Sequence, residues 1–351
     1  MAPAPGPDQP MAASPARIGI LGAGSLGAYL GGSLMAAGAQ VCLIGRPRMR
    51  QRIARHGLIL SNHLGQRIRL PSEQVNFTER PESLSEVDLI LLCVKSADTA
   101  AAAAAIASHA RIGTPVISMQ NGIGNSALLR KILPAYPVLA AMAPFNVVQL
   151  DDGRLHRGTA GELMVEASTL LAPWHDLFAW AGLPLQERQG FDAVLWGKLL
   201  LNLNNPVNAL SGLPLKLQLS QRPYRLVLAA LIAEALQLMA RAGIRPAAVG
   251  RAPPRWLPSL LRLPDFLFTR LAARMLGMDA EARSSMWEDL RAGRPTEVDF
   301  LNGAVLELAR TLGRDAPLNR RICALVHQAQ RQGLHRMSAL EMGEALRFDP
   351  D

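Results

Sequence analysis

The chain has 351 residues, 49% of them hydrophobic and 19% charged, and its formal net charge is +9. This length suits two domains, and polar residues interrupt every apolar stretch before the roughly 18 residues that a membrane span needs. The positive charge is spread along the chain, with no long basic block and few interleaved aromatic residues. We therefore expect neither a membrane protein nor a nucleic-acid partner.

Residues 1–16 are rich in proline and alanine and are predicted to form a disordered tail. They lack the basic start and continuous apolar block of a signal peptide, which favours a cytoplasmic protein. Cys42, Cys93 and Cys323 are dispersed without metal-site spacing, and we interpret them as buried thiols in a reducing compartment. The histidines are equally scattered, so the sequence predicts no metal.

The first predicted elements, in residues 17–46, form a β-α-β unit. An apolar run at residues 18–21 leads into the turn Gly22-Ala23-Gly24-Ser25-Leu26-Gly27, then a helical stretch, then a second apolar run at residues 41–44. In such a G-x-G-x-x-G turn the glycines allow a tight turn, a close pyrophosphate and close helix packing, and the helix start faces the phosphates. The alternative is a glycine-rich turn in an unrelated α/β domain, but the flanking elements favour a dinucleotide site.

The end of the second run indicates which dinucleotide binds. An NAD site usually has an acidic residue there, about 20 residues after the glycines, to hold the ribose 2′-hydroxyl. Here the sequence is Gly45-Arg46-Pro47-Arg48, without an acid. An arginine fork binds a phosphate bidentately, so we predict NADP(H), with Arg46 on the 2′-phosphate and Arg48 assisting.

Further elements alternate between strand and helix up to about residue 189, which predicts a doubly wound, mostly parallel sheet of the Rossmann type. After a short helix at residues 51–55, strand-like runs lie at residues 57–60, 66–70, 87–95, 115–119, 138–142, 161–166 and 183–187. Helices are expected at residues 99–110 and 170–180. Lys95 and Asn121 follow two of these strands, where ligands bind in such folds.

From residue 190 to 351 the pattern becomes helical, which predicts an all-α second domain after a Rossmann domain of residues 17–189. Helices are expected at residues 191–203, 223–242, 280–291, 297–312 and 317–332. Residues 251–278 are rich in Pro, Arg, Leu, Phe and Trp and form either a small helical lobe or an interface element. The helices after residue 220 are apolar on wide faces, which is compatible with a homodimer.

Lys198, Asn202 and Asn205 are spaced to share one face of the first of these helices, and leucines fill its other faces. Polar groups on a buried helix are costly unless they face a polar cleft. The stripe is therefore either a solvent face, with the asparagines ending the helix before Pro206, or a site with a proton-donating lysine. Only four of the 37 basic residues are lysines, and an arginine could not release a proton.

The last candidate block is Ser284-Ser285-Met286, followed by Thr296-Glu297-Val298-Asp299 and Asn302-Gly303. Read alone, the serines and Thr296 are helix caps.

Taken in order, these motifs resemble those of the ketopantoate reductase (2-dehydropantoate 2-reductase) family. The resemblance rests on GAGSLG, VK at 94–95, QNG at 120–122, WGKLLLN at 196–202, and SSM, TEVD and NG between 284 and 303. It implies a Rossmann domain, a helical domain and a site between them, and NADPH-dependent reduction of ketopantoate to pantoate on the route to pantothenate and coenzyme A.

The resemblance also implies roles for individual residues. Lys198 matches the catalytic lysine, which would act as general acid, and Asn202 and Ser285 match substrate-binding positions. Cofactor-binding positions are matched by Gly22, Ala23, Gly24, Ser25, Leu26, Gly27, Arg46, Lys95, Asn121 and Glu297. Pro206 stands where the family often has a further asparagine, which Asn205 or Asn208 would replace. This departure and the long 251–278 stretch leave open a reductase of another keto acid, and a non-catalytic NADP-binding regulator is a further alternative.

Overall fold

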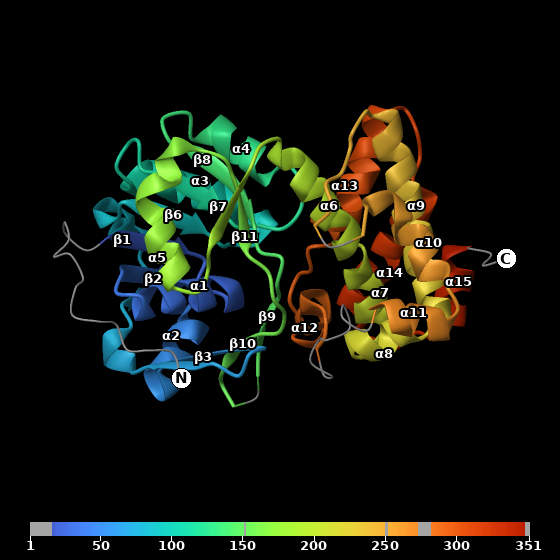
Figure 1. The fold of residues 1–351 in the computed structure, drawn as a ribbon, viewed down its shortest axis with the longest axis horizontal. Helices are drawn as coiled ribbons and strands as arrows, with labels where there is room; N and C mark the ends of the chain where they lie inside the picture. The colour runs from blue at the N-terminus through green and yellow to red at the C-terminus, as the bar shows by residue number, and fades with distance from the viewer. Residues whose placement is uncertain (1–15, 151, 250–251, 273–281, 348–351) are drawn as a thin grey trace.

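The computed structural model describes residues 16–150, 152–249, 252–272 and 282–347. Most of the predicted tail, the end of the 251–278 stretch and the start of the helix expected at 280–291 lie outside these residues. The described chain forms a Rossmann-type α/β half and an all-helical half, which lie side by side (Figure 1). This confirms the fold class that the sequence predicts.

The main sheet has eight strands in the order β12-β11-β8-β7-β6-β1-β2-β5, and every neighbouring pair except β8 and β11 is parallel. Its strands are β1 Arg17–Leu21, β2 Gln40–Ile44, β5 Phe77–Thr78, β6 Leu89–Leu92, β7 Val116–Ser118, β8 Val138–Met142, β11 Leu163–Glu166 and β12 Leu185–Arg188. In β1, Ile18 lies beside Val41 of β2 and Leu89 of β6. The glycine turn after β1 is therefore at the middle of the sheet.

Helices cover both faces of this sheet, because its central strands are apolar on both sides. In β6, Leu89 and Leu91 pack in one cluster with Leu30 of α1, while Ile90 and Leu92 pack in another with Ile106 of α3. The helices of this half are α1 Ser25–Ala36, α2 Pro47–His56, α3 Thr99–His109, α4 Asn125–Ile132 and α5 His175–Trp180. Short 3-10 turns are η1 Ser72–Gln74, η2 Pro81–Glu86, η3 Ser96–Asp98 and η4 Thr169–Trp174.

A second, four-stranded sheet has the order β4-β3-β10-β9. The hairpin of β3 Leu58–Asn62 and β4 Arg67–Leu70 is the one that the sequence predicts. The other strands, β9 Val147–Gln149 and β10 Leu155–Arg157, are missing from the prediction. They are short, and β10 becomes a strand by pairing with the distant β3, so a local pattern does not reveal it.

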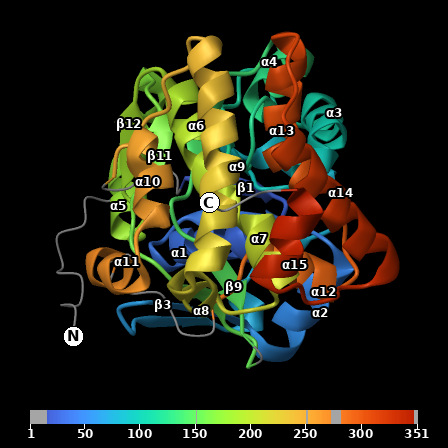
Figure 2. The ribbon, with the colours of Figure 1, turned by 90° about the vertical axis from the view of Figure 1, so that its right-hand side faces the viewer.

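The second half is helical throughout its described residues. Its helices are α6 Phe191–Asn202, α7 Asn204–Ser211, α8 Leu215–Ser220, α9 Arg222–Arg241, α10 Leu257–Arg262, α11 Asp265–Ala272, α12 Ser285–Arg291, α13 Val298–Thr311, α14 Pro317–Gln332 and α15 Ala339–Leu346, with the 3-10 turn η5 Pro254–Trp256. α9 is long and apolar enough to cross a membrane by length and composition alone. It runs through the middle of this half, with 67% of its apolar window buried, as expected of a core helix (Figure 2).

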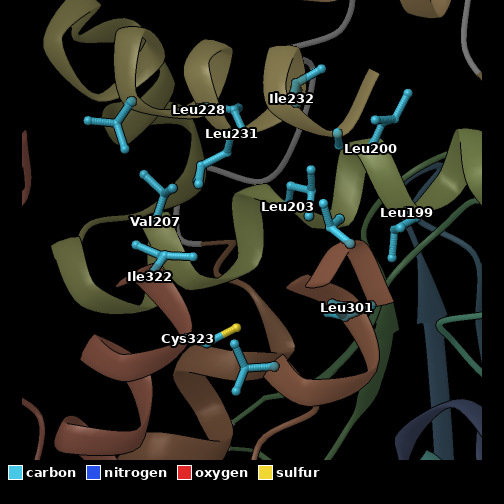
Figure 3. Close-up of a cluster of buried hydrophobic side chains, with 14 of the residues drawn as sticks. Leu199, Leu200, Leu203, Val207, Leu228, Leu231, Ile232, Leu301, Ile322 and Cys323 are labelled. Atoms are coloured by element: carbon cyan, nitrogen blue, oxygen red, sulfur yellow. The ribbon is translucent and has the colours of Figure 1, made fainter. Parts of the chain in front are cut away.

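The leucines of α6 hold it in the helical core (Figure 3). Leu199 and Leu200 of α6, and Leu203 directly after it, pack in one buried cluster with Leu231 of α9 and Leu301 of α13. The described part of the 251–278 stretch folds as α10 and α11, in keeping with a small helical lobe. Arg225 of α9 anchors this lobe: its buried guanidinium donates to the Leu263 carbonyl and pairs with Asp265 at 2.8 Å.

Candidate active site

The turn between β1 and α1 has the geometry that a dinucleotide requires. Gly22 has φ 102°, and a Cβ there would lie 2.5 Å from the Val94 nitrogen, so a side chain is excluded. A Cβ at Gly27 would collide with the Gly22 carbonyl, so α1 can pack this closely only because Gly27 has no side chain. A Cβ at Gly24 would meet nothing within 4 Å. Space is thus left where the sequence predicts a pyrophosphate.

The N-terminus of α1 has no side chain capping it in the described structure. Gly24 is its N-cap, and Ala23, Ser25 and Leu26 are the neighbouring predicted cofactor residues. The first N–H groups of a helix need partners, and a phosphate is a suitable one. The uncapped start and the open Gly24 therefore fit a bound dinucleotide.

Arg46 lies two residues after the end of β2, as the N-cap of α2, and an acidic residue lies close to it. Its Nη2 is 3.0 Å from Asp98 Oδ2, and the arginine side chain is 79% exposed. Asp98 belongs to η3, which follows β6. Because β6, β1 and β2 are consecutive in the sheet, their carboxyl ends meet at one edge, so an acid remote in sequence approaches Arg46. Arg48 is exposed on α2.

The ends of β6 and β7 meet residues of the helical half. Lys95 Nζ lies 2.7 Å from Asp289 Oδ2 and donates to the Pro295 carbonyl at 2.9 Å. Glu297 Oε1 accepts from the amide of Ser96 at 3.1 Å and from its hydroxyl at 3.2 Å. Lys95 and Glu297, predicted from separate motifs, are therefore brought to one place.

Asn121 lies beside this contact. Its carbonyl accepts from Ser96 Oγ at 3.0 Å and from Asn125 Nδ2 at 2.7 Å. Its side chain makes no hydrogen bond within the described residues. The Asn121 amide is therefore available to a ligand at the strand ends.

Lys198 and Asn202 lie four residues apart on α6, so they share a face. α6 also packs on β8 of the Rossmann half, through Phe191, Val194 and Leu195. Burial lowers the pKa of Lys198 to about 8, and within the described ranges its ammonium group makes no hydrogen bond or ion pair. Asn202 is 8% exposed, and its Nδ2 finds no partner in the described structure. An unpartnered buried amide is costly, which suits a group that a ligand completes.

Known proteins resemble this chain in both sequence and fold. The sequence model of the family described as ketopantoate reductase PanE/ApbA matches residues 18–169, and the model of its C-terminal part matches residues 191–330. The chain belongs to the ketopantoate reductase family.

Individual relatives cover nearly the whole chain. A 2-dehydropantoate 2-reductase of Halobacterium salinarum is 29% identical over 327 residues, which span 90% of this chain and 100% of the relative. A PanE/ApbA family ketopantoate reductase from Ralstonia eutropha JMP134 is 30% identical, covers 91% of this chain and 100% of its own, and has a TM-score of 0.75. A D-mandelate dehydrogenase solved with NADH and anilino(oxo)acetate shares the fold, with a TM-score of 0.74 at 20% identity, over 90% of this chain and 98% of its own.

The structure corrects the expectation that Asn205 shares the face of Lys198. α6 ends at Asn202, and α7 begins at Asn204, so Asn205 belongs to another helix. Its carbonyl accepts from Ser284 Oγ at 3.2 Å. The helix is interrupted at Leu203, between Lys198 and Asn205, so spacing in one continuous helix no longer supports a substrate contact for Asn205.

Asn208 is fully buried and has a supporting position. Its Oδ1 accepts from the Ser284 amide at 2.8 Å, and its Nδ2 donates to the Leu213 carbonyl at 3.0 Å. Ser284 in turn caps α12 through the Trp287 amide, as the capping interpretation predicts. Ser285, the next residue, is exposed at the start of α12. Asn208 thus fixes the helix that carries Ser285.

The N-cap of α13 is Glu297, one residue after the predicted Thr296, and the Glu297 side chain makes no capping bond. The Thr296 hydroxyl still accepts from the Val298 amide at 3.5 Å. Among the described residues no His, Cys, Asp and Glu cluster could hold a metal. Asp98, Ser96 and Asp289 are not among the site residues that the sequence predicts. Asp98 and Ser96 directly follow Lys95 at a strand end, which was the available signal, whereas nothing local marks Asp289.

Proposed function

We propose that this chain reduces ketopantoate to pantoate with NADPH, and that Lys198 is the general acid. The observation that carries the proposal is the pair on α6: a lysine without a partner in the described structure, beside the unpartnered amide of Asn202. The pair lies on the helix that contacts the Rossmann half. Family membership supports the substrate class.

The chemistry follows from these groups. When bound, the reduced nicotinamide supplies the hydride for the keto carbon. The keto oxygen gains negative charge and needs a proton. The Lys198 ammonium stabilises this charge by a hydrogen bond and then donates the proton from Nζ. Asn202 and Ser285 would orient the substrate's carboxylate and hydroxyl, while Lys95, Asn121 and Glu297 hold the cofactor side of the site. This reaction would supply pantoate for pantothenate.

The first experiment measures NADPH oxidation with ketopantoate and a panel of other 2-keto acids. Lys198→Ala should lower kcat by roughly 10²- to 10⁴-fold, as for loss of a general acid. Lys198→Arg should lose nearly as much, because arginine keeps the charge but does not release a proton. Lys216→Ala, at an exposed lysine of α8, is the matched control and should keep full activity. An unchanged kcat in Lys198→Ala would remove Lys198 as the acid.

A second candidate function is reduction of a different keto acid by the same mechanism. The interruption between α6 and α7 near Pro206 favours this second function, because it changes which side chains follow Asn202 on the side of the proposed substrate site. Turnover of another acid with none on ketopantoate would establish it. Tight cofactor binding with no turnover on any acid would instead indicate a non-catalytic NADP-binding regulator.

NADPH rather than NADH is expected because Arg46 can bind a 2′-phosphate. Asp98 beside it offers the opposing possibility of holding a 2′-hydroxyl, and fold relatives have been solved with NADH. We expect Arg46→Ala to raise KM for NADPH at least roughly tenfold, the loss of a charge-assisted contact, with KM for NADH unchanged. Asp98→Asn should lower KM for NADPH, because it removes a competing carboxylate.

The control for the cofactor experiment is Arg320→Ala, at an exposed, ion-paired arginine of α14. Wild-type preference for NADH, with a raised KM for NADH in Asp98→Asn, would reverse the assignment.

We further propose a cytoplasmic homodimer, in line with a Staphylococcus aureus ketopantoate reductase described as dimeric. Sedimentation of the purified protein tests the dimer.

A further inference from the structure

An acidic residue of α12 makes a short polar contact with the Rossmann half. Asp289 Oδ2 lies 2.7 Å from Lys95 Nζ, and the Asp289 side chain is only 9% exposed. Its other oxygen, Oδ1, accepts from Arg294 Nε at 3.0 Å. Each carboxylate oxygen thus has a cationic partner, one in each half of the molecule.

The backbone around Asp289 is fixed as well. Its carbonyl accepts from the Arg294 amide at 2.8 Å, which closes the turn after α12. The next residue, Pro295, accepts from Lys95, and Glu297 accepts from Ser96. Lys95 and Ser96 are therefore fixed by contacts with the segment 289–297 of the helical half.

Asp289 also relates Lys95 to the predicted substrate contact. Ser285 and Asp289 are four residues apart on α12, so they lie on the same face of the helix. A salt bridge from Asp289 to the end of β6 therefore turns the face with Ser285 toward the strand ends. An ammonium has three donors, and Asp289 and the Pro295 carbonyl take two of those of Lys95. One donor is left, in a fixed direction, for a ligand.

We propose that Asp289 is a positioning residue of the active site. It orients Lys95 toward the cofactor and holds the Ser285 face of α12 against the Rossmann half, so that both sides of the site are placed by one carboxylate. A small displacement of such groups lowers the reaction rate strongly, because catalysis depends on holding the reacting groups in the correct orientation. The proposal rests on the proposed function for its catalytic effect, and on the predicted role of Lys95 for its effect on cofactor binding.

The test compares Asp289→Asn, Asp289→Glu, Lys95→Gln and the Lys95→Gln/Asp289→Asn double variant. We expect Asp289→Asn to lower kcat/KM for the keto acid and to weaken NADPH binding, each at least roughly tenfold, with the thermal midpoint little changed. Asp289→Glu should recover part of both losses. The double variant should lose no more than the worse single variant, because the two side chains act as one unit.

Glu307→Gln, at an exposed carboxylate paired with Arg310 on α13, is the matched control and should leave all readouts unchanged. Wild-type kcat/KM and NADPH binding in Asp289→Asn would overturn the proposal. So would losses in the double variant that equal the product of the single losses, or a loss of activity that merely follows a lower folded fraction. If the wild type reduces no keto acid, the proposed function fails, and NADPH titration of the same variants still decides the role of Asp289.

Discussion

At the scale of the residue, Lys198 combines a charge with burial. No opposite charge contributes to its pKa, so desolvation acts alone and lowers the pKa to about 8. An acid near this value is protonated at neutral pH and still able to give up its proton. An arginine could not release its proton in this way, which explains why an arginine-rich chain has a lysine at position 198.

A pH dependence follows from this pKa. Above about pH 8 the Lys198 ammonium loses its proton, so kcat for keto-acid reduction should fall by about tenfold per pH unit. The reverse oxidation, which needs the neutral amine, should rise with pH up to about pH 8 and level off above it. The measurement is kcat in both directions against pH, with NADPH binding as control. A flat profile for reduction through about pH 9 would contradict the assignment.

At the scale of the element, the start of α12 depends on side chains of another helix. Asn208 of α7 holds the Ser284 amide, and Ser284 caps α12 and bonds to the Asn205 carbonyl. α12 is short, with bounds Ser285–Arg291, and a short helix has little stability of its own. Its position, and hence that of Ser285, is set by these bonds.

We predict that Asn208→Ala destabilises the protein by about 1–3 kcal/mol, because it leaves the buried Ser284 amide and the half-buried Leu213 carbonyl unpaired. KM for the keto acid should rise as Ser285 moves, while NADPH binding is kept. Denaturant unfolding and steady-state kinetics measure the two effects. Gln332→Ala, at an exposed amide at the end of α14, is the control, with an expected change below about 0.5 kcal/mol. A fully stable Asn208→Ala with normal KM would show that α12 is positioned otherwise.

At the scale of the whole molecule, the two halves meet closely at a further point, Gly122. A Cβ at Gly122 would lie 2.7 Å from the carbonyl oxygen of Phe300 in α13. Gly122 follows Asn121, and Phe300 lies just after Glu297. The absence of a side chain therefore lets α13 approach the strand ends on which the predicted cofactor residues lie.

Gly122→Ala should push α13 away and lower kcat/KM several-fold or more. Gly124→Ala is a closely matched control: Gly122 and Gly124 have φ 88° and 89°, but a Cβ at Gly124 meets nothing within 4 Å. Both variants should lose about 1–3 kcal/mol of stability from backbone strain. Only Gly122→Ala should lose activity beyond that, measured per folded molecule. Equal activities in the two variants would mean that this close approach has no part in catalysis.

The sequence by itself determined the elements and the motifs. The glycine turn, the apolar runs of β1, β2 and β6 and the leucine-rich α6 are local patterns, because burial on one or both faces imposes a period that is readable within a few residues. For the same reason the sequence placed Lys198 and Asn202 on one helix face. It missed the two-residue β5, and it missed β10, which pairs with β3, and β9, which pairs with β10. It also ran α6 past its end at Asn202.

Only the tertiary structure decided which groups face each other. Ser96 and Glu297 are 201 residues apart in the chain and share a hydrogen bond, Asp98 reaches Arg46 across the sheet edge, and Asp289 joins Lys95. Such contacts follow from how the halves pack and from the order of strands, neither of which leaves a periodic trace in the sequence. The residues within each motif could therefore be predicted from the sequence, whereas their contact partners from distant parts of the chain could be identified only in the folded structure.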